Sequence, residues 1–253
     1  MKKKIYLDYA STTPTDPKVV KAMEPYWNTY YGNPSSLYQL GLKSKEAISQ
    51  AKIKISKLLN CQTDEIIFTG GGTESVNLAL KGVMNKIEAG HMITSSIEHH
   101  AVLHTADSLK KSGQAISILP VDAEGLIKLS DIETAIQDNT RLISIMIANN
   151  EIGVIQDIQK IGALIEKINK ARAKKALPRI YFHTDACQAS GTLDLDVKKL
   201  HVDLMTINGS KIYGPKGVGL LYIKTGTIIR AIIDGGGQEK NLRSGTENVP
   251  GIV

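Results

Sequence analysis

The stretch Thr206–Tyr222, TINGSKIYGPKGVGLLY, contains the pattern that decides the fold. Its β-branched start predicts a strand that ends at Asn208, and Val218–Ile223 predicts a second strand. Glycine and proline between them place Lys211 in a tight turn. A lysine in such a turn can face a cleft, where loss of water favours the neutral amine and lets it condense with an aldehyde. Most lysines are solvated surface charges, so a catalytic Lys211 needs support from other residues.

The rest of the chain alternates predicted strands and helices. We expect strands at Lys4–Leu7, Glu65–Thr69, His91–Ser95, Ile116–Leu119, Leu142–Ala148, Arg179–His183 and Val202–Ile207. We expect helices from Pro17, along the apolar stripe Ile48–Leu59, after Thr73, after His100, from a capping box at Ser130, from Ile158 to before Pro178, and from Asn248. This alternation, with several strands apolar throughout, predicts an α/β fold whose mostly parallel sheet is covered by helices on both faces.

The composition is that of an ordinary globular protein, with 42% hydrophobic and 22% charged residues in 253. Its net charge of +6 comes from scattered basic residues, so a solvated surface is favoured and a nucleic-acid groove is the remote alternative. Cys61 and Cys187 form neither a disulfide framework nor a metal-ligand pair. We see no membrane span and no apolar core of a signal peptide, and we expect a cytoplasmic protein.

Polar groups follow several of the predicted strands, and ligands of open α/β sheets bind outside the carboxyl ends of the strands. Gly70–Thr73 separates a strand from a helix start, so its free N–H groups, its hydroxyl and the helix dipole suit a phosphate. Asp185 follows the strand Arg179–His183 and could keep a pyridine nitrogen protonated, while Gln188 could donate to a ring oxygen. An ordinary βα turn and a helix-capping aspartate are the alternatives for these two groups.

Two further candidates follow other strands. His99 comes after His91–Ser95 and has a flat ring and a titratable nitrogen, so it could stack on a planar cofactor and move protons; His100 is its competitor. Asn150 could contact a ring hydroxyl, although turn asparagines are common. An amine, a phosphate site, a carboxylate and a stacking ring together match pyridoxal 5′-phosphate better than any other common cofactor.

Eight segments resemble one known family. They are YLDYASTTPTD, GNPSS, EIIFTGGGTESVNLALKG, EHHAV, NNEIGVIQDI, HTDACQA, SKIYGPKGVG and GGGQEKNLRSGTENV. In this order, from Ile5 to Val253, they look like the cysteine desulfurases of the NifS/IscS group, which are class V aminotransferases of pyridoxal phosphate fold type I. The resemblance implies the large domain of that fold, with a mixed, mostly parallel, seven-stranded sheet.

The resemblance also implies roles for residues around the cofactor ring. Lys211 would bind pyridoxal phosphate covalently, and His99 would stack on the ring and exchange protons. Asp185 would pair with the pyridinium nitrogen and Gln188 with the phenolic oxygen. Asn150 would lie beside the ring.

Further roles implied by the family concern the phosphate and the substrate. The phosphate would be surrounded by Gly72, Thr73, Asn208 and Ser210, of which the last two stand where the family commonly has serine and histidine. Asn33 would lie near the substrate. Thr246 would reach the phosphate of the neighbouring subunit, which implies a homodimer.

The family's reaction converts L-cysteine to L-alanine and leaves a persulfide on the enzyme for a sulfur acceptor such as an iron–sulfur scaffold protein. Residues 1–15 would pack on a small domain, and residues 16–253 would form the cofactor-binding large domain. The family's catalytic cysteine and its substrate-binding arginine would lie beyond Val253, and Cys187 is more typical of a buried small hydrophobe than of a substitute nucleophile. We therefore expect little or no turnover from this chain alone. Another class V enzyme (an aminotransferase or a selenocysteine lyase) and a non-catalytic cofactor-binding fragment or scaffold are the alternatives.

Overall fold

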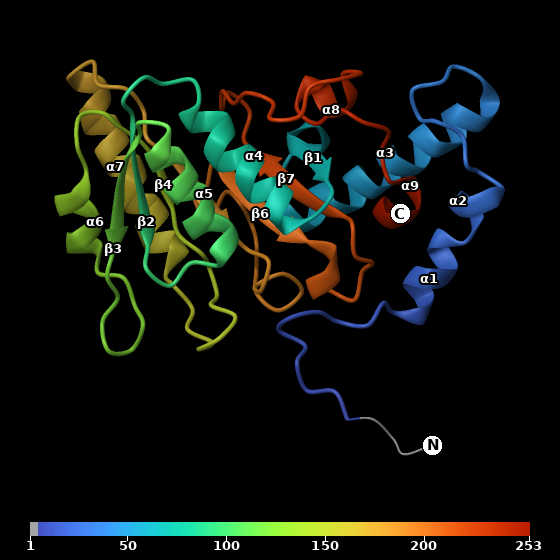
Figure 1. Cartoon of the computed structure of the whole chain (residues 1–253), viewed down its shortest axis with the longest axis horizontal. Helices are drawn as coiled ribbons and strands as arrows, with labels where there is room; N and C mark the ends of the chain where they lie inside the picture. The colour runs from blue at the N-terminus through green and yellow to red at the C-terminus, as the bar shows by residue number, and fades with distance from the viewer. Residues whose placement is uncertain (1–4) are drawn as a thin grey trace.

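The computed structural model of the protein describes residues 5–253 and has a seven-stranded sheet at its centre, with strand order β1-β7-β6-β5-β4-β2-β3 (Figure 1). Strand β7 runs antiparallel to both of its neighbours, β1 and β6, whereas the other neighbouring pairs are parallel. The mixed, mostly parallel sheet expected from the sequence is confirmed. The strands are β1 (Ile66–Thr69), β2 (His91–Ser95), β3 (Ala115–Leu119), β4 (Thr140–Ser144), β5 (Tyr181–Asp185), β6 (Leu204–Asn208) and β7 (Gly219–Ile223).

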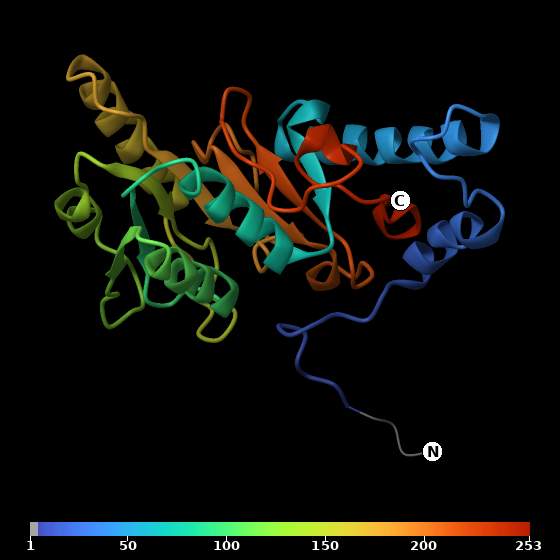
Figure 2. The ribbon, with the colours of Figure 1, turned by 45° about the horizontal axis from the view of Figure 1, so that its top comes forward.

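Helices connect the strands and extend from one end of the sheet. They are α1 (Pro17–Met23), α2 (Pro25–Asn28), α3 (Gln39–Leu59), α4 (Gly72–Met84), α5 (His100–Lys111), α6 (Leu129–Ala135), α7 (Ile158–Lys174), α8 (Gln238–Asn241) and α9 (Val249–Ile252), with short 3-10 turns η1 (Thr63–Glu65) and η2 (Gly209–Lys211). Asp16 caps α1 by accepting a hydrogen bond from the Lys18 N–H, as the Asp-Pro sequence predicts. In Figures 1 and 2 residues 5–16, which precede α1, run along the lower side of the molecule.

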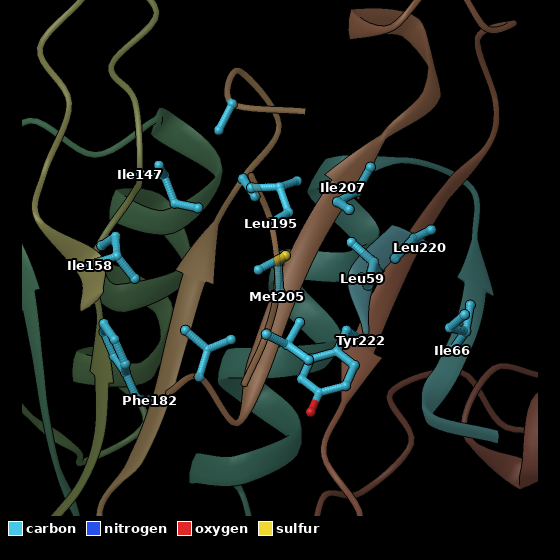
Figure 3. Packing of buried hydrophobic residues seen from close by; sticks show 14 of the residues in the cluster. Leu59, Ile66, Ile147, Ile158, Phe182, Leu195, Met205, Ile207, Leu220 and Tyr222 are labelled. Atoms are coloured by element: carbon cyan, nitrogen blue, oxygen red, sulfur yellow. The ribbon is translucent and has the colours of Figure 1, made fainter. Parts of the chain in front are cut away.

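Two hydrophobic clusters lie on opposite faces of the sheet, because successive strand residues point to opposite sides. Ile66 and Phe68 of β1 belong to the cluster that includes buried residues of α3 and α7, whereas Ile67 between them belongs to the cluster formed with α4 and α5. Figure 3 shows part of the first cluster, with Met205 and Tyr222 of neighbouring strands among its side chains. The prediction of helices on both faces is therefore confirmed.

Several boundaries differ from the sequence-based expectations. Ile5–Leu7 is not a strand, and Lys4 lies outside the described residues. Strand β4 ends at Ser144, although the N–H groups of Ile145 and Ile147 still bond to carbonyls of β5. Pairing with β2 stops at Ser144, so the predicted strand continues on one side only.

Two side-chain predictions are also wrong. Helix α6 begins at Leu129 with Lys128 at its N-cap and no side-chain cap, so Ser130 forms no capping box. Leu58, predicted on the buried stripe of α3, is 77% exposed.

Among the helices of residues 5–253, none combines the length and the hydrophobicity that crossing a membrane requires.

Candidate functional site

A hollow with about 520 Å³ of empty space, solvent included, lies where the strands present their carboxyl ends. Asp185 ends β5, Asn208 ends β6, and Lys211 ends the turn η2 that follows β6 directly. The residues that line the hollow are Gly72, Thr73, His99, Ala101, Met146, Ala148, Asn150, Asp185, Cys187, Gln188, Asn208 and Lys211. The fold thus brings most of the predicted site residues to one place, as the end-of-strand rule requires.

The end of the glycine turn after β1 forms one wall of the hollow, where Gly72 has no room for a side chain. A Cβ on Gly72 would lie 2.9 Å from the Cys187 Sγ and 3.3 Å from the Asn208 Cβ. Gly71 has a φ of +145°, which favours glycine. In residues 5–253 the N–H groups of Gly72 and Thr73 have no acceptor, and they point from the first turn of the 13-residue α4. Free N–H groups at a helix N-terminus form an anion site.

Ser210 lies on the other side of this turn, in an adjoining hollow. This second hollow is lined by the glycine turn, by Asn208 and Ser210, and by the exposed Lys216. Lys216 supplies a positive charge that the sequence pattern did not single out. The two hollows share Gly72, Thr73 and Asn208, so a ligand could place a phosphate in one and a ring in the other.

A salt bridge holds the glycine turn in shape. Glu74 accepts the Gly70 N–H at 2.8 Å through Oε2 and the Arg243 Nε at 2.8 Å through Oε1. Arg243 follows α8, so the segment near residue 240 is attached to the start of α4. The charge of Glu74 beside the anion site is therefore offset by a guanidinium.

Asp185 is 6% exposed and faces the hollow from the end of β5. Its Oδ1 accepts the Cys187 N–H at 2.9 Å, which fixes the carboxylate relative to the turn that follows. Gln188, in the same turn, donates from Nε2 to the backbone oxygen of Ala10 at 2.6 Å. A carboxylate held in this way can accept a hydrogen bond from a ring N–H group.

The amine of Lys211 is held by the N-terminal segment. Its Nζ lies 2.6 Å from the backbone oxygen of Ala10 and 2.6 Å from that of Ser11. Thr13 attaches this segment to the lysine turn, because its N–H donates to the backbone oxygen of Ser210 at 2.9 Å. The sequence placed Lys211 in a tight turn but gave no sign that residues 10 and 11 would contact it.

His99 is the N-cap of α5, and this position determines its proton arrangement. The Nδ1 atom accepts the Ala101 N–H at 3.0 Å. In the neutral ring the hydrogen is therefore on Nε2. The neighbouring His100 lies edge-on to it, with ring centroids 6.2 Å apart. His100 does not line the hollow that contains Lys211 and Asp185, which favours His99 of the two.

Two site residues were missed by the sequence reasoning. Glu98 is 5% exposed, and burial raises its pKa to about 8, with a further contribution from Asp185. Asn149 donates to the backbone oxygen of Ile97 at 2.7 Å and so joins the loop after β4 to the loop that carries His99. An acidic residue in the loop between β2 and α5 was the available signal for Glu98, but burial could not be inferred from it.

Asn33 and Thr246 lie outside the hollow. Asn33 is exposed, and its side-chain oxygen accepts the Ser35 N–H at 2.9 Å in the turn before α3. Thr246 is exposed after α8. Neither residue is among those that line the hollow with Lys211 and Asp185.

The two cysteines are poorly suited to nucleophilic chemistry. Burial and nearby carboxylates raise the pKa of Cys61 to about 11, and burial followed by Asp185 raises the pKa of Cys187 well above its ordinary value. Within residues 5–253, no cluster of three or more histidine, cysteine or acidic side chains could hold a metal ion.

Comparison with known proteins places the chain in a family. The model of the family described as Aminotransferase class-V matches residues 5–253. The cysteine desulfurase IscS of Clostridium botulinum is 49% identical over 255 residues, which cover 100% of this chain and 62% of that protein. The cysteine desulfurase IscS of Methanosarcina thermophila is 49% identical over 253 residues, which cover 99% of this chain and 60% of that protein. The chain thus spans about 60% of the length of these curated relatives.

Similar solved structures support the same family assignment. A NifS-like protein has a TM-score of 0.93 at 39% identity, with 99% of this chain and 67% of that chain covered. SspA in complex with cysteine has a TM-score of 0.92 at 40% identity, with 98% of this chain and 70% of that chain covered. The fold is therefore the pyridoxal phosphate fold type I of these proteins. The chain belongs to the class V aminotransferase family and, within it, to the group of NifS-like and IscS-like proteins.

Proposed function

We propose that this chain is the cofactor-binding part of a pyridoxal 5′-phosphate-dependent cysteine desulfurase. Pyridoxal 5′-phosphate is the cofactor of the family. The observation that carries the proposal is that the Lys211 amine, the Asp185 carboxylate and the Gly72–Thr73 turn line one hollow. Free N–H groups suit the phosphate. Gly72 lies too close to Cys187 and Asn208 for a side chain to fit, so glycine is required at this wall of the hollow. The residues present therefore fit this cofactor.

Each group has a role that follows from its chemistry. We assign the phosphate to Gly72, Thr73, Asn208 and Ser210, with Lys216 adding positive charge at the rim. Asp185 would accept a hydrogen bond from the pyridinium nitrogen and Gln188 would donate one to the ring oxygen, with Asn150 beside the ring. When bound, pyridoxal phosphate supplies an electron-poor ring that stabilises negative charge at the α-carbon of an amino acid.

The chain's own residues would bind the cofactor, exclude water and move protons. Lys211 must leave the oxygens of Ala10 and Ser11 and lose a proton from Nζ before it can act as a nucleophile. His99 would cover one face of the ring and carry a transferable hydrogen on Nε2. Because Gln188 and Lys211 share the oxygen of Ala10, movement of the N-terminal segment would free both donors together.

The proposed substrate is L-cysteine, and the proposed products are L-alanine and a persulfide on a protein thiol. The names of the relatives and the cysteine bound in SspA support this substrate. A thiolate would attack the substrate sulfur, take it as the carbon–sulfur bond breaks, and leave the three-carbon amino acid to be protonated. Neither Cys61 nor Cys187 has the low pKa that this attack requires. We therefore propose little or no turnover for this chain alone.

The remaining assignments are also proposals. Residues 16–253 would form the cofactor-binding domain, and residues 1–15 would pack on a second, smaller domain. Thr246 would contact the phosphate of a neighbouring subunit in a homodimer, since it is exposed in this chain. Asn33 would lie near the substrate. The acceptor of the sulfur would be a protein such as an iron–sulfur scaffold, and the location would be the cytoplasm, where free cysteines persist.

Cofactor binding can be tested directly. The purified chain is incubated with pyridoxal phosphate, reduced with borohydride and digested, and the modified peptide is identified by mass spectrometry. We expect the pyridoxyl group on Lys211, a visible absorbance band before reduction, and loss of both in Lys211→Ala. The exposed Lys175→Ala variant is the matched control and should retain both. A colourless protein, or modification spread over many lysines, would contradict the proposal.

The substrate is tested by adding amino acids to the loaded protein and measuring sulfide, selenide and alanine. Rapid release of sulfide from L-cysteine would contradict the low turnover proposed here. Release of selenide alone would favour a selenocysteine lyase, and amino-group transfer to a keto acid would favour an aminotransferase. Binding of the cofactor without any of these reactions would fit a non-catalytic fragment.

A further inference from the structure

Glu98 is a buried carboxyl group whose two oxygens have different surroundings. Oε1 accepts the Ser95 Oγ–H at 2.7 Å and the Met146 N–H at 2.8 Å. Oε2 is buried and has no hydrogen-bond partner in residues 5–253. An ionised carboxylate would leave a charged oxygen without a partner in a dry site, which is costly. A neutral acid with its proton on Oε2 avoids most of that cost.

The position of Glu98 connects it to two walls of the cofactor hollow. It directly precedes His99, and it bonds to the N–H of Met146, whose side chain lines the same hollow. Asn149 makes a parallel connection by donating to the backbone oxygen of Ile97. Glu98 and Asn149 therefore join the loop after β2 to the loop after β4.

The charge of Asp185 also opposes ionisation of Glu98. Asp185 is near enough to raise its pKa, in the same direction as burial. Glu98 also lines a third hollow, which adjoins the first one at Lys211 and His99. The other charged or titratable side chains of this third hollow are Asp8, His99, His100, Glu151 and Lys211. Asp185 is the one carboxylate among the residues that line the first hollow, which Lys211 shares with Gly72 and Thr73.

We propose that Glu98 is a positioning residue of the pyridoxal phosphate site, which acts as a neutral acid to hold His99 and Met146 in place and leaves Asp185 as the negative charge of the hollow. This inference rests on the proposed cofactor. It assigns Glu98 no contact with the cofactor or the substrate. Glutamine has the same shape as a neutral glutamic acid, so Glu98→Gln should preserve the connection and Glu98→Ala should break it.

The first experiment measures ionisation without cofactor. Thermal unfolding midpoints of wild type and Glu98→Gln are compared from about pH 5 to pH 9. Because the folded pKa is raised from 4.5 to about 8, the wild type loses stability as pH rises through this interval. The midpoint difference should therefore move in favour of Glu98→Gln and become constant above about pH 8. Midpoints that shift in parallel at every pH would overturn the neutral state.

The matched control is Glu151→Gln, which makes the same change at an exposed position of the same hollow. Its midpoint difference from wild type should not depend on pH over this interval.

Ser95→Ala is a second variant that keeps the carboxyl group. It removes a donor that lowers the Glu98 pKa, so the pH above which the loss of stability is complete should rise. No movement of that pH would also count against the proposal.

The second experiment measures the dissociation constant of pyridoxal phosphate by absorbance titration. At neutral pH we expect Glu98→Gln to stay within about threefold of wild type and Glu98→Ala to bind at least about tenfold more weakly. The ratio of the wild-type dissociation constant to that of Glu98→Gln should rise with pH above about 8, because only the wild type has a carboxyl group at this position that can ionise. Effects of pH on other groups are common to both proteins and cancel in this ratio. Equal binding by all three proteins would refute the positioning role alone. Absence of binding by wild type would refute the proposed function itself, whatever the unfolding curves show.

Discussion

The Nζ atom of Lys211 lies 2.6 Å from the backbone oxygen of Ala10, which precedes it by 201 residues in the chain. A second oxygen, that of Ser11, accepts from the same amine at 2.6 Å. These two carbonyl oxygens accept hydrogen bonds from the amine and hold it in place. The N-terminal segment is therefore part of the site around the reactive amine, and Thr13 attaches it to the lysine turn.

Thr13→Val should loosen this attachment. The Thr13 Oγ1 donates to the backbone oxygen of Ser210 at 3.0 Å and accepts the Tyr213 N–H at 2.8 Å, and the residue is buried. Valine has the same shape but leaves the Tyr213 N–H without a partner, so the free energy of unfolding in urea should fall by about 1–3 kcal/mol. Thr12→Val is the control, because the hydroxyl contacts of Thr12 are long, at 3.4 and 3.5 Å. Equal losses in both variants would show that the bonds of Thr13 are not the cause.

Arg243→Met should weaken binding of the phosphate group. The substitution leaves the Glu74 charge without its guanidinium partner beside the glycine turn. At a partly exposed site we expect a cost of about 1 kcal/mol, or roughly a fivefold increase in the dissociation constant of pyridoxal phosphate. Pyridoxal without phosphate should be unaffected. The double variant Arg243→Met with Glu74→Gln removes the stranded charge and should recover most of the affinity; failure to do so would point to a distorted turn instead.

Both thiols should react slowly at neutral pH. Burial and the carboxylates near Cys61 raise its pKa to about 11, so its thiolate fraction at neutral pH is about two orders of magnitude below that of an ordinary cysteine. Iodoacetamide labelling of the native protein should accelerate with pH up to about 11 for Cys61 and should be slower still for Cys187. The urea-unfolded protein provides the reference rate. Fast labelling of Cys187 at neutral pH would reopen it as a candidate nucleophile.

His183 should make the protein less stable in mild acid. It is fully buried between the hydroxyls of Ser144 and Thr206, at 2.8 and 3.0 Å, and burial lowers its pKa to about 3 from 6.5. The unfolded chain therefore takes up a proton below pH 6.5 that the folded chain refuses, and stability falls as pH decreases toward 3. Between pH 7 and pH 5 this amounts to about 2 kcal/mol.

The His183→Gln variant isolates this effect. Its own stability is expected to be lower at pH 7, because glutamine fits the two hydroxyls less well, but the difference from wild type should shrink by about 2 kcal/mol at pH 5. His104→Gln, at an exposed position of α5, should show no such change. Urea unfolding at the two pH values measures both. A constant difference for His183→Gln would mean that the folded protein accepts a proton at this position.

Local patterns in the sequence predicted the fold well. The alternation of apolar runs and helical periods predicted β2 to the residue and a mostly parallel sheet, because strand and helix preferences depend on neighbouring residues. The antiparallel part of the sheet was expected only from the family resemblance. Expectations failed where partners far along the chain decide the outcome. Ile5–Leu7 has strand-like residues but pairs with no strand, and β4 stops where its pairing with β2 stops.

For the candidate site, too, some features follow from the local sequence and others only from the folded chain. The sequence determined which groups stand at the carboxyl ends of the strands, and so it named Lys211, Asp185, His99 and the glycine turn without any coordinates. Tertiary structure alone decided that Ala10 and Ser11 hold the lysine amine, that Glu98 is buried with one oxygen unpaired, and that Asn33 and Thr246 lie outside the hollow. The physical reason is that a residue's type and spacing set its local conformation, whereas its burial, its partners and its protonation depend on segments that only the folded chain brings together.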